Sequence, residues 1–462
     1  MVEIIFGIIM IASFIGMVLY CVKGLNLMVG FFLMATLWTV LSLIGNAFVP
    51  NEQVIAHMGE GGIMDAIKYV FADGPASYSS SILVNVFFGA FFGRVLVDTG
   101  IAATLIRKVV ELGGDKPKIT MTLLCIVTAV IFMSMTGIGP VISIAVIVLP
   151  ILLSLGIPAP VAMFSFMGSI MAGIFGNIVN FAQYQGIFAG FVPEAADYIY
   201  QDYFRVGLIA MVVSLVVVLV VSFLFLSKKK NSHAWAATAP QGAADNAPWY
   251  SWIAVILPVI GVVTINFPII PGFIVAGVYA LLTTGKLRGG YKEICRLFAK
   301  LFTDGTIDIA PMVGFLLTLA MFNNAATFAS PYFTAILGGI IPTTPIVLAI
   351  MFGVLTVLGF FRGPMNLVGC GTAILAVVVA VFNASATPAA TMIGFLYPLF
   401  AITTIAPQHL DITQSWVAWG FGYTKVSTKD YMKMSIPTGW IIGLVMCVIV
   451  YFMYVSGTLI MA

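Results

Sequence analysis

The sequence predicts an all-α polytopic membrane protein built from two inverted-topology repeats, with broken helices and re-entrant hairpins. Three observations support this class. The chain is 61% hydrophobic and 8% charged, and its mean hydropathy is +1.13. Apolar runs long enough to span a bilayer, about 20 residues each, recur along its length. Equivalent loops of its two halves carry opposite charge. Only lipid can solvate so much apolar surface, so a soluble fold is excluded.

The apolar runs of the 462-residue chain predict roughly 11 to 13 membrane segments. The runs are continuous rather than alternating, which argues against a β-barrel. The first run, IIFGIIMIASFIGMVLYCV, lacks a basic leader and a cleavage site, so we expect a retained helix. Motifs of zinc hydrolases, phosphate loops and nucleophile elbows are missing. We therefore expect neither an enzyme nor a nucleic-acid-binding protein, and no organic cofactor.

A polar stretch near the middle, SKKKNSHAWAATAPQGAADNAPWY, divides the chain. It predicts a first inverted repeat over 1–227, a cytoplasmic linker over 228–250 and a second inverted repeat over 251–462. The two halves align at a nearly constant offset of 224 or 225 residues. The aligned features are Gly89 with Gly314, Asp98 with Asn323, Gly113-Gly114 with Gly338-Gly339, Pro140 with Pro364, and Gln183 with Gln408.

Loop charges give the orientation of the two halves. The loop over 107–118 is basic, and its counterpart GGIIPTTP is uncharged. The acidic loop over 51–78 corresponds to a basic one over 286–300, and the acidic stretch after Gln183 corresponds to a basic one after Gln408. By the positive-inside rule, the two halves lie upside down relative to each other. This is the pattern of an inverted-repeat secondary transporter.

Two stretches leave the topology open. Residues 119–191 fit either three passes or one pass with a re-entrant hairpin, and 345–423 pose the same alternative. We expect hairpins, because each stretch contains a polar segment interrupted by Gly and Pro, MSMTGIGPVIS at 133–143 and FFRGPMNLVG at 360–369. Irregular backbone at membrane depth is tolerated only where it is buried in protein or lines a watery cavity. Such breaks also expose helix N-termini, which favour anions.

Arg362 lies inside the second break, where an arginine is costly. Its planar fork matches a carboxylate or phosphate, so an anionic substrate would compensate for its burial. The alternatives are pairing with a structural acid such as Asp98 or Asp411, and snorkelling to the interface.

A second polar cluster follows each break. The first contains Asn177, Asn180, Gln183 and Gln185, and the second runs from Thr403 to Ser415. Neutral amides and hydroxyls suit the hydroxyls of a sugar acid or hydroxy acid, and with freed carbonyls they also suit a sodium ion. Hydrogen bonding between helices is the alternative. His409 and Asp411 in the second cluster are candidate titrating groups.

Asp98 lies four residues after Arg94, which predicts a salt bridge on one helix face. The alternative is a coupling site for a proton or cation, because carboxylates in membranes often act as relays. Asn323 and Asn324 take its place in the second half. Our candidate coupling-ion residues are therefore Asp98, Asn323, Asn324, His409 and Asp411.

The chain resembles the ion transporter superfamily of gluconate, citrate, lactate and C4-dicarboxylate permeases. The resemblance is carried by GRVLVDTGIAATLIRKVVELGGDKPK, by MTGIGPVISIAVIVLPILLSLGIPAPVA, and by a second half that repeats the plan. It implies organic-anion binding between inverted repeats at hairpin tips, coupling to H+ or Na+, a multi-pass protein of the bacterial inner membrane, and a homodimer. By position it implies these substrate-binding residues: Ser134, Thr136, Gly137, Gly139, Asn177, Asn180, Arg362, Gly363, Asn366 and Gln408. Any sodium ion is expected near Gly137, Asn177 and Gly363.

We therefore expect a secondary active transporter that moves a small organic anion by alternating access. The substrate would be a carboxylate such as a sugar acid, hydroxy acid or dicarboxylate. The main alternative is a cation/proton antiporter that uses Asp98. A channel and a membrane-embedded enzyme are further alternatives without a motif to support them.

Overall fold

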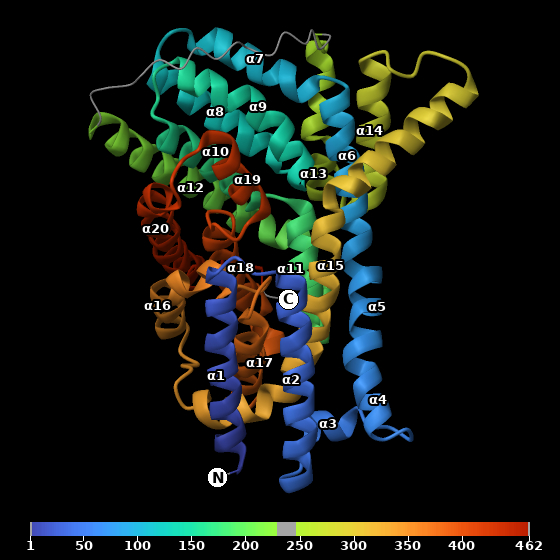
Figure 1. The fold of residues 1–462 in the computed structure, drawn as a ribbon, viewed down its shortest axis with the longest axis vertical. Helices are drawn as coiled ribbons and strands as arrows, with labels where there is room; N and C mark the ends of the chain where they lie inside the picture. Colours follow the sequence, from blue (N-terminus) through green and yellow to red (C-terminus); the bar gives the residue numbers. More distant parts are fainter. Residues whose placement is uncertain (1, 229–245, 461–462) are drawn as a thin grey trace.

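The computed structural model describes residues 2–228 and 246–460. Every regular element in these residues is a helix, which confirms the predicted all-α class (Figure 1). Most of the predicted linker, residues 229–245, lies outside the described residues.

The first half begins with α1 (Val2–Val22) and α2 (Leu27–Phe48). After the short α3 (Glu52–Ala56) a 36-residue helix runs over Ile63–Asp98. Two π-helical turns interrupt it, and each marks an extra residue in the helical ladder. Its parts are α4 (Ile63–Lys68), η1 (Tyr69–Asp73), α5 (Gly74–Tyr78), η2 (Ser79–Leu83) and α6 (Val84–Asp98).

A helical hairpin, a bent helix and a closing helix complete this half. After α7 (Ile101–Gly113), the hairpin consists of α8 (Pro117–Phe132) and α9 (Ile138–Ser154), which lie side by side at one end of the molecule (Figure 1). The bent helix consists of α10 (Ala159–Ile174) and α11 (Ile178–Ala189), at 60° to each other. The 3₁₀ turn η3 (Pro193–Asp197) leads to α12 (Tyr200–Lys228).

The second half contains the same kinds of element in the same order. It opens with η4 (Trp249–Val255), α13 (Leu257–Ile265) and α14 (Ile269–Thr283), followed by the 47-residue α15 (Tyr291–Leu337). Its hairpin is formed by α16 (Pro345–Leu355), η5 (Thr356–Arg362) and α17 (Gly371–Asn383). Its broken helix and closing helix are η6 (Ala389–Met392), α18 (Ile393–Gln408), α19 (Ser415–Thr424) and α20 (Thr428–Val455).

The two halves run in opposite directions. In Figure 1 the helix over 63–98 rises from the bottom of the view, whereas α15 descends from the top. The α8–α9 hairpin lies at the top and the α16–α17 hairpin in the lower half. Hairpins therefore occupy both stretches whose topology the sequence left open. The constant offset fails from the hairpin tips onward. Pro140 lies within α9, whereas Pro364 precedes α17. Likewise, Gln183 lies within α11, whereas Gln408 ends α18.

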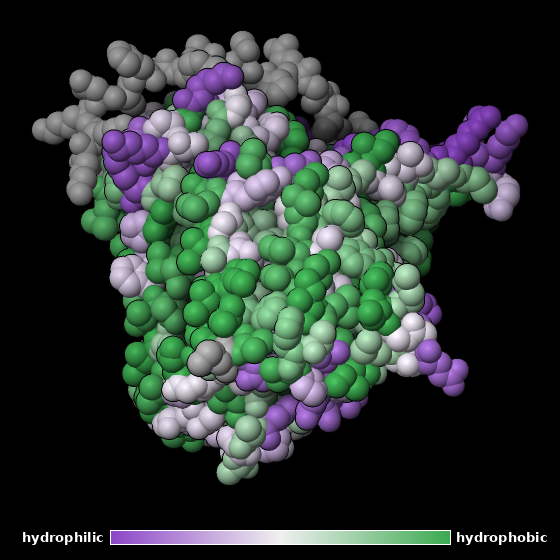
Figure 2. Space-filling view, turned by 60° about the horizontal axis from the view of Figure 1, so that its bottom comes forward, coloured by the Kyte–Doolittle hydropathy of each residue, from purple (hydrophilic) through white to green (hydrophobic). Residues whose placement is uncertain are grey.

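Membrane-spanning helices are numerous in the described residues. Eight helices are long and apolar enough to cross a membrane, or nine if the bent α10–α11 pair counts as one span. Four shorter apolar helices, among them α8, α9 and α17, bring the total to the upper end of the predicted range. Figure 2 shows the corresponding surface, a broad hydrophobic face with hydrophilic residues toward its upper and lower edges. The protein is a multi-pass membrane protein.

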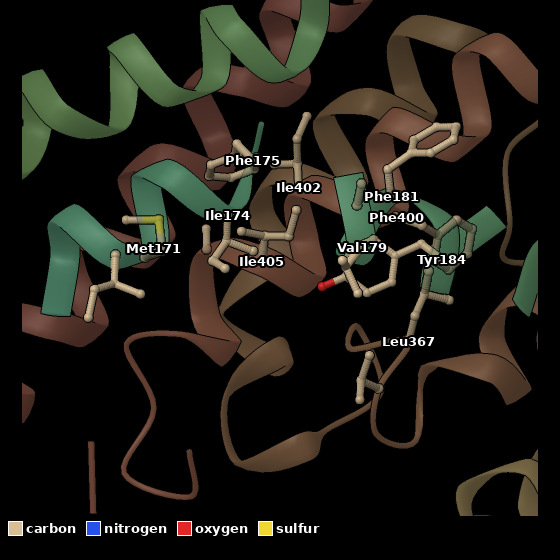
Figure 3. Close-up of a cluster of buried hydrophobic side chains, with 14 of the residues drawn as sticks. Met171, Ile174, Phe175, Val179, Phe181, Tyr184, Leu367, Phe400, Ile402 and Ile405 are labelled. Atoms are coloured by element: carbon tan, nitrogen blue, oxygen red, sulfur yellow. The ribbon is translucent and has the colours of Figure 1, made fainter. Parts of the chain in front are cut away.

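The core joins the two bent helices to the second hairpin. One group of buried side chains contains Met171 and Ile174 of α10, Phe181 and Tyr184 of α11, and Phe400, Ile402 and Ile405 of α18 (Figure 3). Leu367, which lies between η5 and α17, is at the edge of this group. All of these residues are at most 4% exposed. This cluster packs α11 and α18 together beside the second hairpin tip, and polar residues near the ends of these helices line one cavity.

Candidate functional site

The interrupted segments meet at one cavity of about 520 Å³. Its wall is formed by the first turn of α2, the tip of the first hairpin, the start of α11, the segment of α15 around Pro311, the tip of the second hairpin, and the link from α18 to α19. Each of these segments is a helix end or a proline-containing turn, where backbone groups lack their usual helical partners. The cavity is therefore the candidate functional site.

The first hairpin tip, residues 133–137, is held by Asn177 at the bend of α10–α11. The Asn177 amide Nδ2 donates to the carbonyl oxygens of Phe132 and Met135, at 2.8 and 2.9 Å. Its Oδ1 accepts from the first-turn N–H groups of Val179 and Asn180, at 2.9 and 3.0 Å. The side chain thus caps α11 and ties the tip to the bend. Asn177 is 1% exposed and does not line the cavity.

The N-terminus of α9 leaves this tip without a side-chain cap. Gly137, its N-cap residue, has a φ of 97°, a conformation that residues with a Cβ rarely adopt. Gly137, Thr136 and Ile138 all line the cavity. The free N–H groups and positive dipole end of α9 therefore lie at the cavity wall, where they favour an anion.

The second hairpin tip has an irregular backbone with its own supports. Phe361 and Arg362 have φ values of 56° and 57°. The Asp411 carboxylate accepts the Phe361 N–H and also the N–H and hydroxyl of Thr413, at 3.1 and 2.8 Å. Asn366 donates to the Gly359 carbonyl at 3.2 Å. Asp411 and Asn366 are buried behind the wall, so both stabilise the tip.

Arg362 extends from this tip to the cavity wall and is 4% exposed. Its Nη2 donates to Gln414 Oε1 at 2.6 Å, and its Nη1 donates to the Val368 carbonyl at 3.2 Å. The guanidinium lies 5.4 Å from the centre of the Phe315 ring, and its Nε has no hydrogen-bond partner.

No carboxylate lies within 4.0 Å of the Arg362 guanidinium among the described residues. The two structural acids that the sequence offered as partners are therefore not its ion-pair partners, because each is engaged elsewhere. Asp411 accepts hydrogen bonds from Thr413 and Phe361, and Asp98 pairs with Lys300. Snorkelling does not apply either, because the side chain is buried.

Further polar atoms at the cavity lack a protein partner. These are Oε1 of Gln408 and both ring nitrogens of His409. Gln408 is 5% exposed and His409 is 1% exposed. A buried polar atom without a partner costs about 1–3 kcal/mol. Together with Arg362 Nε, these atoms are the groups that a polar ligand could satisfy.

The structure brings together only part of the predicted site. The candidates that line the cavity are Thr136, Gly137, Asn180, Arg362, Gln408 and His409. The candidates outside its wall are Ser134, Gly139, Asn177, Gly363, Asn366 and Asp411.

Asp98, the candidate coupling residue, lies elsewhere. Its carboxylate is 3.6 Å from Lys300 of α15, and its side chain is 28% exposed. The predicted pairing of Asp98 with Arg94 is wrong, because Arg94 lies 3.7 Å from Asp308, also of α15. Because α6 packs closely on α15, α15 supplies the ion-pair partner of both residues, Asp308 for Arg94 and Lys300 for Asp98. The spacing of residues along one helix does not reveal such partners.

Asn323 and Asn324 line a second cavity of about 250 Å³, beside the π-helical turns. Asn324 donates to the Tyr69 carbonyl at 2.8 Å. The Tyr78 hydroxyl, also at this cavity, accepts from Gln183 Nε2 at 2.9 Å. Gln183 in turn lines the main cavity, so this one hydrogen bond lies between the two spaces.

Sequence reasoning missed Asp308 of the main site. Asp308 is an acid in a long apolar helix, three residues before Pro311, and that combination was its available signal. Gln414 belongs to the second polar cluster that the sequence indicated, but it was not among the predicted substrate-binding residues.

The fold is similar to that of the YdaH transporter of Alcanivorax borkumensis, whose crystal structure is described as having an unusual topology. The TM-score is 0.60 at 12% sequence identity, over 86% of this chain and 90% of that one. No protein-family model matches the sequence, and no curated protein matches it at a significant level. The likeness supports the coarser expectation, a membrane transporter fold, and does not extend to the permease families that the motifs resemble.

Proposed function

We propose that the protein is a secondary active transporter of a small organic anion, driven by an H+ or Na+ gradient through alternating access. The substrate class is a carboxylate such as a sugar acid, a hydroxy acid or a dicarboxylate. The observation that carries this proposal is Arg362, a buried guanidinium at the cavity wall without a carboxylate partner among the described residues.

The wall of the cavity suits a carboxylate with hydroxyl groups. Arg362 supplies a fork for the carboxylate, and the uncapped N-terminus of α9 faces the same space. The N-cap residue of α19, Gln414, also makes no capping bond. Neutral amides from Asn180, Gln183 and Gln408 complete the wall, and a volume of about 520 Å³ is in the range of small-molecule sites.

Alternating access is supported by the arrangement of the elements. Two hairpins and two bent helices meet at the cavity from opposite directions, and discontinuous helices around a central site are the usual plan of secondary transporters. The resemblance of the motifs to organic-anion permeases favours the same substrate class. A homodimer in a bacterial inner membrane remains a prediction that follows from that resemblance.

The alternative function, a cation/proton antiporter, depends on Asp98 as its ion-binding carboxylate, and the position of Asp98 does not favour this role. Asp98 is outside the cavity and paired with Lys300. An exchanger of cations alone would also leave the buried positive charge of Arg362 without a ligand role. We therefore favour the organic-anion transporter.

The test is thermal stabilisation of the purified protein by a panel of mono-, di- and tricarboxylates and sugar acids, in sodium and in potassium buffer at two pH values. A ligand that binds the folded state raises apparent stability by mass action. We expect a selective shift with one carboxylate class, its loss in Arg362→Ala, and its retention in the control Arg205→Ala, an exposed arginine of α12. A flat response to every anion, with a shift from sodium or pH alone that Asp98→Asn removes, would favour the antiporter.

A further inference from the structure

Asp308 is the acidic residue of the main cavity. Among the lining residues that the structure describes, it is the one carboxylate, and Arg362 is the one lysine or arginine side chain. Asp308 comes from α15 of the second half, one turn before Pro311, and its side chain is 12% exposed. An anionic substrate held by Arg362 would therefore share a largely desolvated space with a second negative charge.

The carboxylate of Asp308 is held loosely. Its Oδ2 lies 3.7 Å from Arg94 Nε, too far for a hydrogen bond. Both of these atoms lack any hydrogen-bond partner. Asp411 at the other hairpin differs, since it accepts three hydrogen bonds from Phe361 and Thr413. Asp308 is thus free to change its contacts without breaking a network.

The same carboxylate lies against the N-terminus of α9. A Cβ built on Gly139, in the first turn of α9, would overlap the Asp308 carboxylate. The glycine therefore permits the close approach. Because that helix end has no side-chain cap, Asp308 occupies the region where the free N–H groups of α9 favour an anion. In this conformation the protein's own carboxylate occupies a helix end that would otherwise favour the negative charge of a substrate.

The charged groups around Asp308 come from few elements. On α6 they are Arg94 and Asp98, and on α15 they are Lys300 and Asp304. Neither α9 nor α2 carries a charged residue. Asp98 and Lys300 pair with each other, which leaves Arg94 and the helix end as the positive groups next to Asp308. A sodium ion at this carboxylate would need several further oxygen ligands, whereas a proton needs none.

We infer that Asp308 is the proton-coupling residue of the transporter and a tethered competitor of the substrate at the α9 N-terminus. This inference rests on the proposed function. When ionised, Asp308 occupies the helix end and repels the substrate, because two carboxylates sharing a site cannot readily both ionise. When it takes a proton from the water that reaches the cavity, it becomes neutral and yields the position. Substrate and proton then bind together.

The experiment measures protons taken up on binding. Calorimetric titration of the purified protein with the best carboxylate of the panel, in buffers of different ionisation enthalpy, gives the number of protons per anion. For the wild type we expect one proton per anion. The affinity of the wild type for the anion should also fall about tenfold for each unit by which the pH rises, over part of the range from roughly pH 5 to pH 9. Linkage requires this slope when one proton binds with the anion. Asp308→Asn should bind the anion without proton uptake and without this pH dependence.

Transport in proteoliposomes gives the second readout. Asp308→Asn should lose accumulation driven by a pH gradient but keep exchange of labelled for unlabelled substrate. The matched controls Asp304→Asn and Asp98→Asn should keep both. Proton-driven accumulation in Asp308→Asn, or wild-type binding without proton uptake, would overturn the inference and leave the proposed function standing. The measurement of proton uptake by the wild type does not depend on whether the Asp308→Asn variant folds. Failure of the wild type to bind any anion of the panel would overturn the proposed function, and the inference with it.

Discussion

The two hairpin tips reach the same cavity but are fixed in different ways. The first tip is neutral and is held by Asn177, whose side-chain amide donates hydrogen bonds to the carbonyl groups of Phe132 and Met135. The N-terminus of α9, which follows this tip, faces the loosely held Asp308. The second tip carries Arg362, and its backbone is fixed by the fully engaged Asp411. A carboxylate thus lies at each tip, but only that of Asp411 is bound by a network.

This difference separates two roles that a buried acid can have. A carboxylate whose oxygens accept several hydrogen bonds maintains a backbone shape, and replacing it lowers stability. A carboxylate held by one long ion pair contributes little to stability and can change its charge or position. The comparison therefore predicts that substitutions at the second tip affect binding and folding strongly, whereas Asp308 affects coupling.

The largest effect is expected at Arg362. Arg362→Ala should lower the affinity for the preferred carboxylate at least about 100-fold, because it removes a desolvated, charge-assisted contact worth roughly 3 kcal/mol. Arg362→Lys keeps the charge but loses the fork, and should bind about tenfold more weakly than the wild type. Calorimetric titration measures both values. Affinity within threefold of the wild type in Arg362→Ala would show that the two tips do not differ in anion binding.

The next effect concerns the fold. Asp411→Asn replaces one of the two acceptor oxygens by an NH2 group, so that at least one donor of Phe361 or Thr413 loses its partner. Each buried group left without a partner costs about 1–3 kcal/mol. We expect a clear fall in the unfolding temperature of the purified protein. The matched variant Asp308→Asn should unfold within a degree or two of the wild type, because its carboxylate makes no hydrogen bond. Equal losses in the two variants would remove the contrast between them.

A smaller loss of stability is expected at the first tip. Asn177→Ala deletes a helix cap, worth about 1 kcal/mol, together with two bonds to tip carbonyls. Its unfolding temperature should fall less than that of Asp411→Asn but more than that of the control Asn180→Ala. Asn180 has one long side-chain bond, at 3.4 Å to Tyr184. An Asn177→Ala protein as stable as the wild type would mean that the tip is held by its backbone alone.

The smallest effect is expected at Gln414. Gln414→Ala removes the 2.6 Å bond to Arg362 but leaves the bond to the Val368 carbonyl. Loss of one such bond, about 0.5–1.5 kcal/mol, should weaken carboxylate affinity about two- to tenfold. The measurement is the same titration as for Arg362. A loss as large as that of Arg362→Ala would show that Gln414 contacts the substrate itself.

Much of the fold could be predicted from the sequence, because the strongest signals are local. Hydropathy predicts the helices, and Gly and Pro mark the breaks. Arg362 stood out because a charged residue in an apolar run has few explanations. Loop charges predicted the opposite orientation of the halves, in agreement with the opposite directions of the 63–98 helix and α15 (Figure 1).

The remaining features depend on contacts between helices. Arg94 lies one turn from Asp98, yet it faces Asp308 because α6 packs on α15. Spacing along one helix carries no information about such a neighbour. The alignment of Gln183 with Gln408 failed because the tip of the second hairpin is longer, so that α17 begins 233 residues after α9 (371 − 138). The structural role of Asn177 was hidden for a similar reason, since its carbonyl partners lie more than 40 residues away.

The charges at the cavity have a consequence for the response to membrane voltage. Arg362 and an ionised Asp308, the charged lining residues, give the empty cavity a net charge of zero. With Asp308 protonated and a monocarboxylate bound, the sum is again zero. Each unit of charge carried across 100 mV changes the free energy by about 2.3 kcal/mol, and between these two states that contribution cancels. The loaded and the empty carrier would therefore respond alike to the membrane potential, and a monocarboxylate would be accumulated by the pH gradient alone.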